Sequence, residues 1–335
     1  MFHLRSILHA FEQLFTTLVS QGFAGVRPVA SGLNDIFYGV FMSAVVVGLV
    51  APTAQTAGFE PPPSERPSIE ETIERFAPEV RFHPRERYFP SSVSWFIERS
   101  ELRVDGEQAP GAPTLAEGQT SASILPTLAM EKQKSKRFDP KRYFLEIAGD
   151  ADEERVRQGN LDSAQTYVHF RETSDGSAGY DIQYWFFYPY SGPLMGGPAG
   201  GAHEGDWEHI TVRVDSSRQN IQKIFYACHV SEGRWLDPKQ VRFDQGDHPV
   251  VYSARYGHAS YPRAGVHSRG FLPADRTADG GARWKTWNSV ELVAVDGEAL
   301  PEKKWMRFAG RWGQVGTLFS GPRGPAFQAY WHGPQ

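Results

Sequence analysis

The chain has 335 residues, with 35 Lys and Arg against 39 Asp and Glu, which gives a formal net charge of −4 at pH 7. This mildly acidic balance gives no electrostatic basis for nucleic-acid binding, so we expect no nucleic-acid partner. The single cysteine, Cys228, excludes an intrachain disulfide. Aromatic residues make up 13% of the chain, beside 33 Gly and 24 Pro, a composition typical of short strands and turns.

Residues 1–57 differ from the rest of the chain. Apolar residues recur at helical spacing over Leu4–Leu18, and residues 36–59 carry no charged side chain. The apolar centre, Ile36–Ala51, is short for a membrane-spanning helix, which needs about 20 residues. Because its length is typical of the apolar core of a signal peptide, we expect a leader and a secreted or periplasmic (cell-envelope) protein. Membrane anchoring is the alternative.

The remaining chain is expected to form one domain over residues 68–335, after a Pro-rich linker at 58–67. Ser68 and Glu71 have the spacing of a capping box, which predicts a short helix ending near Phe76. Residues 105–140 lack a clear period and are interpreted as a surface insertion, with a short helix near Leu125–Lys136.

The fold class expected for this domain is all-β, a β-sandwich with long loops and a short N-terminal helix. The run Tyr184–Tyr188 is apolar on both faces, as a central strand requires. The turn-rich segment after Val214 suggests a hairpin. Seven stretches have the composition of strands: Arg142–Ile147, Thr166–Arg171, Tyr180–Tyr188, Glu208–Val214, Lys223–Val230, Pro249–Arg255 and Val290–Val295.

Candidate ligands for a metal lie in the segment H-E-G-D-W-E, residues 203–208. In an extended strand Asp206 and Glu208 share one face, roughly 6–7 Å apart, and repel by roughly 2–3 kcal/mol at a dielectric of about 20. A divalent cation removes that conflict, and His203 is close enough in sequence to join as a third ligand. Oxygen ligands with one imidazole suit Ca²⁺ or Mg²⁺ first, then Mn²⁺, or Zn²⁺ with a second imidazole.

A purely structural explanation remains open for the same carboxylates. They could be solvated or could pair with Arg213, Arg255 or Arg263, and a closed ion-pair network with Arg255 or Arg263 would leave no ligand function. Direct contacts of these arginines with both carboxylates would favour this explanation.

Two histidines outside the segment are further candidates. His229 follows a strand-like run, and His258 lies in the turn Y-G-H-A-S-Y-P. Either could contact a ligand, as could Arg255. If the protein is a metal-dependent hydrolase, Glu208 or His258 is the candidate general base. A hydrogen-bonded structural histidine is the alternative for each.

The chain resembles the Vps62 family, named for a vacuolar protein sorting factor. The similar blocks are F-A-P-E-V-R-F-H-P-R-E-R-Y-F-P, Y-D-I-Q-Y-W-F-F-Y-P-Y-S-G-P, H-E-G-D-W-E-H-I-T-V, Y-S-A-R-Y-G-H-A-S-Y-P and the closing F-A-G-R-W-G. They spread over roughly residues 76–332. The resemblance implies a fold and the position of a site more than an activity.

A more distant resemblance is to the necrosis- and ethylene-inducing peptide 1-like proteins, which are secreted cytolysins with a G-H-R-H-D-W-E motif. It implies a β-sandwich that holds a divalent cation and binds sphingolipid head groups. His203, Asp206 and Glu208 match the motif's three metal ligands. Gly205 replaces its second histidine, and Ser191 stands where the family has a further aspartate.

The leading hypothesis is therefore a cation-binding β-sandwich that recognises a membrane head group or a glycan and could be cytolytic. Nothing in the sequence points to an obligate protein partner. The rival hypothesis is the metal-dependent hydrolase.

Overall fold

The computed structural model describes residues 66–104, 107–108, 125, 143–149, 151–193, 201–229, 233–270, 272–313 and 320–333. All of these lie in one compact unit, Gly58–Gln335. Among them, no helix has both the length and the apolar character needed to cross a membrane. The expected leader, most of the linker and most of the expected insertion and its helix fall outside the described residues.

The first described helix, α2 (Ile69–Phe76), begins at the predicted capping box. The Glu71 amide donates to the Ser68 hydroxyl at 3.0 Å, and the Ser68 amide donates to the Glu71 carboxylate at 2.8 Å. These two bonds satisfy amides that the first turn of a helix leaves without partners. The helix ends before Pro78, and its buried side chains Ile73 and Phe76 pack into the core.

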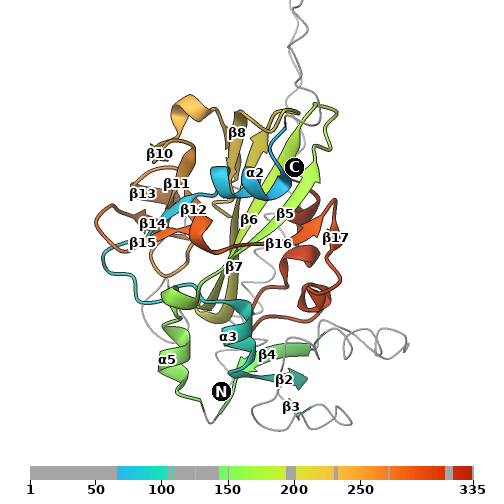
Figure 1. The fold of residues 1–335 in the computed structure, drawn as a ribbon. Helices are drawn as coiled ribbons and strands as arrows, with labels where there is room; N and C mark the ends of the chain where they lie inside the picture. Colours follow the sequence, from blue (N-terminus) through green and yellow to red (C-terminus); the bar gives the residue numbers. More distant parts are fainter. Residues whose placement is uncertain are drawn as a thin grey trace, which may run out of the picture. The chain divides into compact units, whose positions relative to one another are not determined.

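The largest sheet has seven strands in the order β17-β16-β5-β6-β7-β8-β9 (Figure 1). Neighbours are antiparallel except for β16 and β5, which run parallel. The aromatic strand lies at the centre, as predicted. The strands are β5 (Thr166–Glu172), β6 (Tyr180–Ser191), β7 (His203–Val214), β8 (Ile221–Tyr226), β9 (Arg234–Leu236), β16 (Val290–Val295) and β17 (Glu298–Ala299).

The second sheet follows the order β10-β11-β1-β15, with β12 paired to β11. Its strands β1 and β11 are parallel, although 171 positions separate Glu79 from its partner Val250 at one end of the pairing. The bounds are β1 (Glu79–Arg81), β10 (Phe243–Asp244), β11 (His248–Ser253), β12 (Ser260–Tyr261) and β15 (Arg283–Lys285).

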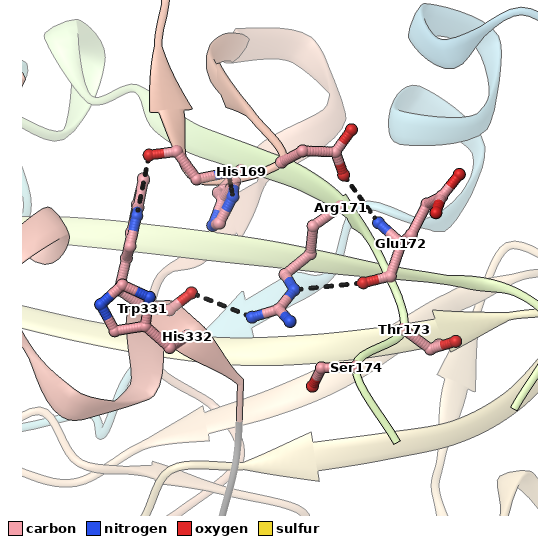
Figure 2. Close-up of a pocket in the computed structure, with 9 residues that line it drawn as sticks. His169, Arg171, Glu172, Thr173, Ser174, Trp331 and His332 are labelled. Atoms are coloured by element: carbon pink, nitrogen blue, oxygen red, sulfur yellow. Dashed lines mark hydrogen bonds between the residues drawn. The ribbon is translucent and has the colours of Figure 1, made fainter. Parts of the chain in front are cut away.

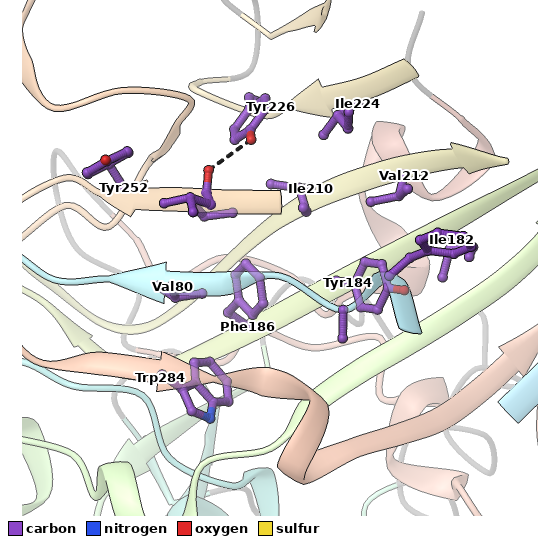
Figure 3. Packing of buried hydrophobic residues seen from close by; sticks show 14 of the residues in the cluster. Val80, Ile182, Tyr184, Phe186, Ile210, Val212, Ile224, Tyr226, Tyr252 and Trp284 are labelled. Carbon is purple, nitrogen blue, oxygen red and sulfur yellow. Dashed lines mark hydrogen bonds between the residues drawn. The ribbon is translucent and has the colours of Figure 1, made fainter. Parts of the chain in front are cut away.

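A hydrophobic core fills the space between these two sheets (Figure 3). Val80 of β1 and Phe186 of β6 both belong to it, and the ring of Phe186 meets that of Trp284 edge-on at 5.6 Å. The buried Tyr226 hydroxyl donates to the Val250 carbonyl oxygen at 2.9 Å, so its polar atom is satisfied. Two sheets packed across one core form a β-sandwich, which confirms the predicted fold class.

The opposite face of the seven-stranded sheet packs on a second hydrophobic core. Trp185 and Phe187 of β6 and Trp207 of β7 point into it. Two short helices, the three-stranded sheet β3-β2-β4 and the C-terminal segment stand on this side. Their bounds are α3 (Val93–Ile97), α5 (Glu153–Arg157), β2 (Ser100–Val104), β3 (Glu107–Gln108) and β4 (Tyr143–Ile147). The sequence did not predict this third layer.

Two further features complete the described fold. The hairpin of β13 (Gly265–Arg269) and β14 (Leu272–Thr277) forms a separate two-stranded sheet. Short 3₁₀ turns join the other elements: η3 (Leu161–Ser163), η4 (Pro238–Gln240), η5 (Thr286–Ser289), η6 (Lys304–Arg307), η7 (Pro325–Phe327) and η8 (Ala329–His332).

Candidate functional site

Strand β7 places Asp206 and Glu208 on the same side of the sheet. They pair with Tyr188 and Phe186 of β6, which both point into the first core. Trp207, between them, packs into the second core. The alternation predicted from the sequence is therefore confirmed, and two carboxylates stand at one end of a buried strand face.

His258 holds the Asp206 carboxylate in place. Its Nδ1 lies 3.0 Å from Oδ2 of Asp206, and its Nε2 donates to the Tyr88 carbonyl oxygen at 3.0 Å. The imidazole is fully buried and stacks on the Tyr188 ring with centroids 3.9 Å apart. Because both ring nitrogens face oxygen atoms within the protein, His258 has no free nitrogen for a substrate in this arrangement.

Glu208 has no comparable partner. Among the described residues, its carboxyl group forms neither a hydrogen bond nor an ion pair. Burial raises the pKa of Glu208 well above its ordinary value, and the nearby charges of Asp206 and Asp275 raise it further, whereas Arg269 acts in the opposite direction. The site therefore holds one carboxyl group whose ionisation is disfavoured, because no positive group compensates the negative charge that it would carry.

Asp275 of β14 adds a third carboxylate that the sequence did not suggest. It accepts hydrogen bonds from the Tyr261 hydroxyl at 2.7 Å and from Nε2 of His229 at 2.5 Å. Burial would raise the pKa of Asp275, but these two bonds, together with the charges of His229 and Arg269, outweigh burial and lower it. Arg269 lies 3.9 Å from the same carboxylate. The buried Asp275 side chain is thus satisfied, unlike that of Glu208.

The loop around His229 shows why the strand predicted to reach Val230 ends at Tyr226. Strand β8 pairs with β7 only between Ile210 and Val214, so the chain beyond Tyr226 has no ladder to continue. It turns away and brings His229 to Asp275 instead.

His203 is not brought to the carboxylates as a metal ligand would be. Its Nδ1 donates to the Gly205 carbonyl oxygen at 2.8 Å, which leaves Nε2 as its second ring nitrogen. Gly205 has φ +64, a left-handed conformation that interrupts the regular strand alternation. Within the described ranges, no group of three or more His, Cys, Asp or Glu side chains is arranged to hold a metal ion.

At Ser191 the hydroxyl donates to the Tyr256 carbonyl oxygen at 3.4 Å.

Gly205 also turns Glu204 to the other side of the strand. Oε2 of Glu204 accepts from the Ile147 amide at 2.9 Å, and Oε1 lies 3.5 Å from Arg157. Burial raises the pKa of Glu204 to about 7, against the lowering effects of these two groups. This carboxyl group lines a cavity of about 280 Å³ between β4 and α5.

The arginines considered as partners of the carboxylates lie elsewhere. Arg213 forms a buried two-point ion pair with Asp181, with nitrogen–oxygen distances of 2.7 and 3.0 Å. The Arg255 guanidinium lies over the Tyr256 ring, 4.1 Å from its centre, and Arg263 is exposed. The closed network of these arginines with Asp206 and Glu208 is therefore not formed among the described residues.

A second hollow, of about 430 Å³, lies where β5 ends beside the turn between β16 and β17 (Figure 2). Arg171 crosses it, donating to the carbonyl oxygens of Trp331 and Glu172 at 3.3 Å each. Asp296 is fixed in the wall, because its carboxylate accepts from the Glu172 amide at 2.9 Å. This hollow is far from Glu208. Glu172, in its wall, pairs with Tyr180 of β6, and Tyr180 pairs with Val214 at the end of β7. Val214 is six residues beyond Glu208, which is about 20 Å along the strand.

The fold and the site together define a β-sandwich protein with an acidic group of side chains at one end of its central strands. Comparison with known proteins identifies its family. The model of the Vps62 family, vacuolar protein sorting-associated protein 62, matches residues 57–316. The chain belongs to this family, as the sequence blocks predicted.

Two relatives come from Saccharomyces cerevisiae. TDA6 is 24% identical over 321 residues, and vacuolar protein sorting-associated protein 62 is 23% identical over 320 residues. In each case 79% of this chain and 67% of the relative are covered.

Similar solved structures include a necrosis and ethylene inducing protein 2 from the causal agent of cocoa's witches' broom disease. It is 13% identical, with a TM-score of 0.32, over 68% of this chain and 75% of that one. Another, NLPPya in complex with glucosamine, is 15% identical, with a TM-score of 0.32, over 69% of this chain and 77% of that one.

Proposed function

We propose that this protein is a recognition module in which Asp206 and Glu208 hold a divalent cation and, through it, a membrane head group or a glycan. The observation that carries the proposal is the Glu208 carboxyl group, which lies beside two other carboxylates without a partner of its own among the described residues. Glu208 is half-buried, and ionising a partly desolvated carboxyl group without a positive partner is costly, a cost that a cation removes.

The donor atoms suit a hard cation. Two carboxylates favour Ca²⁺ or Mg²⁺, with Mn²⁺ next, whereas Zn²⁺ would call for an imidazole. His203 remains the predicted third ligand through Nε2, which requires its side chain to turn toward Asp206. When bound, the cation would neutralise the carboxylates and attract hydroxyl or phosphate oxygens of the ligand.

The surrounding side chains orient these carboxylates. His258 fixes one oxygen of Asp206 and leaves Oδ1 for the cation. His229 and Arg269 hold Asp275 at the edge of the site. Arg255 and His229 remain predicted contacts to the ligand, whereas His258 acts through Asp206.

A metal-dependent hydrolase is the second candidate, and one observation favours it. The raised pKa of Glu208 and its lack of a partner are properties of a general base. Turnover of ester or phosphodiester substrates that is lost in Glu208→Gln would support this function. Ligand binding without turnover would exclude it in favour of the recognition module.

Thermal unfolding with and without chelator tests the cation. A cation that binds only the folded protein at 100 times its Kd stabilises it by about 2.7 kcal/mol. We expect Ca²⁺ or Mg²⁺ to raise the Tm of the parent, and neither to raise that of Asp206→Asn. Glu302→Gln, at an exposed position outside the site, is the matched control and should respond like the parent. Identical Tm values with chelator and with each cation would remove the cation from this account.

The sequence-based expectation of secretion belongs to the same proposal. A leader and a head-group ligand would place the protein at an outer membrane surface, where cytolysis becomes testable as leakage from vesicles. Detection of the mature protein in the culture medium, beginning near Gly58, would support the expectation. Retention of the uncleaved chain, with residues 1–57 still attached, in the cell would oppose it.

A further inference from the structure

The hairpin β13–β14 has one face turned inward and one turned to solvent. Among the described strands it pairs only with itself. His267 and Asp275 stand opposite each other on the inward face, where Asp275 joins the acidic site. Val266 and Arg276 stand opposite each other on the outward face, and both are exposed.

The charge of this part of the chain is opposite in sign to that of the whole protein. Residues 254–278 contain four arginines and one carboxylate, Asp275, which is buried. Arg263 and Arg276 are exposed. Against a net charge of −4 for the whole chain, the exposed charge of this segment is entirely positive.

Neighbouring basic residues extend the outward face of the hairpin. The Arg255 amide donates to the Arg276 carbonyl oxygen at 2.9 Å, which joins the hairpin to the preceding turn. Burial lowers the pKa of His83, and the charges of Arg255, Arg85 and Arg276 lower it further against the opposing charge of Glu86, so all three arginines lie within electrostatic range of His83. Glu86, the acidic group nearby, is buried and accepts from backbone amides.

We call Arg85, Arg255, Arg263, Arg276 and Val266 the basic face. None of its four arginines lies within ion-pair distance of a carboxylate in the part of the chain that the structure describes. Val266 is 63% exposed and is the one exposed large hydrophobic side chain among the described residues. A single exposed valine is ordinary on a protein surface. Here it lies among guanidinium groups that form no ion pair in the described part of the chain, and basic groups of this kind are attracted to anionic lipid.

We propose that the basic face docks the protein on an anionic lipid bilayer. Guanidinium groups form strong hydrogen bonds with phosphate oxygens. Because these arginines are spread over a hairpin and two neighbouring turns, each can bind the phosphate of a different lipid, as a bilayer surface offers. Val266 would lie at the boundary between head groups and acyl chains. Each arginine near such a surface contributes about 1 kcal/mol, which is about a fivefold change in affinity.

This docking goes beyond the proposed cation site and does not depend on it. The basic face is on the outward side of the hairpin, whereas Asp275, which belongs to the acidic site, is on its inward side. Docking through arginines persists when divalent cations are removed, whereas recognition through a cation does not. The two proposals can therefore fail separately.

Cosedimentation of the full chain with vesicles tests the docking. We expect binding to phosphatidylcholine vesicles that contain phosphatidylserine, in the presence of chelator, and weaker binding as salt rises. Arg263→Gln with Arg276→Gln should weaken that binding about twenty-five-fold. Lys304→Gln with Arg307→Gln, which removes equal charge from exposed positions on η6, is the matched control and should bind like the parent. Val266→Asn should also bind more weakly than the parent.

Three results would overturn the proposal. One is equal binding to vesicles with and without phosphatidylserine. Another is an equal loss of affinity in the two double variants, because total charge rather than the basic face would then govern binding. The third is binding to a soluble polyanion, such as heparin, without binding to vesicles, which would identify a different partner. Circular dichroism of each variant checks that the fold is retained.

Discussion

His169 is buried and forms no ion pair with any described residue, so its titration should change the stability of the fold measurably. The residue is 1% exposed, and its ring stacks on Trp331 with centroids 3.9 Å apart. The Gly297 amide donates to Nε2 at 2.8 Å, so the ring proton lies on Nδ1, which donates to Gln183 at 3.0 Å. Burial lowers the pKa of His169 from 6.5 to about 4, although the bond to Gln183 acts to raise it.

The size of the effect follows from linkage between protonation and folding. Below pH 6.5 the unfolded chain takes up a proton at this position, whereas the folded protein does not until about pH 4. Stability is therefore lost as the pH falls through this window and changes no further below it. At about 1.4 kcal/mol for each pKa unit, the loss is about 3 kcal/mol, a large part of the roughly 5–15 kcal/mol that stabilises an ordinary domain.

Urea unfolding across the window from pH 6.5 to about 4 measures this loss. At pH 6.5, His169→Gln should be less stable than the parent, because the stacked ring is gone. As the pH falls to about 4, the free energy of unfolding of His169→Gln should decrease by about 3 kcal/mol less than that of the parent. His332→Gln, at an exposed histidine beside the same hollow, is the matched control and should keep the parent's slope. Parallel profiles for the parent and His169→Gln would refute the reasoning.

Two further substitutions test the structure around the site. Gly205→Ala places a Cβ 1.7 Å from the Trp312 carbonyl oxygen at φ +64, so we expect a loss of more than about 3 kcal/mol in urea unfolding. Gly270→Ala, also at φ +64 but with no atom within 4 Å of the added carbon, should cost only about 1–2 kcal/mol, and equal costs would contradict the close packing at Gly205. Asp181→Asn leaves the buried Arg213 guanidinium partly uncompensated and should cost about 3 kcal/mol by the same assay, whereas a neutral result would show that the pair contributes little.

Local patterns predicted much of the sandwich. The capping box at Ser68 and the double-faced aromatic run Tyr184–Tyr188 specify their elements through short-range chemistry, and both were found as predicted. The strand Val290–Val295 has the predicted bounds. Its parallel pairing with β5 was not predictable, because that contact joins strands over a hundred residues apart.

The acidic site was predictable only in part, for the same reason. Alternation along β7 placed Asp206 and Glu208 on one face, since side chains in a strand follow a period of two. Asp275 and Arg269 reach the site through a hairpin from another part of the chain, and the sequence P-A-D-R-T carries no signal of that position. The hydrogen bond that holds Nδ1 of His203 on the Gly205 carbonyl oxygen is a local contact that the H-x-x-D-x-E spacing does not reveal.

The cation is the central claim of this account, and calorimetric titration of Ca²⁺ or Mg²⁺ into the chelator-treated full chain tests it most directly. We predict saturable binding of one ion per chain, abolished in both Asp206→Asn and Glu208→Gln and retained in Glu302→Gln. Absence of binding heat in the parent at several temperatures, or unchanged binding in the two site variants, would contradict the claim.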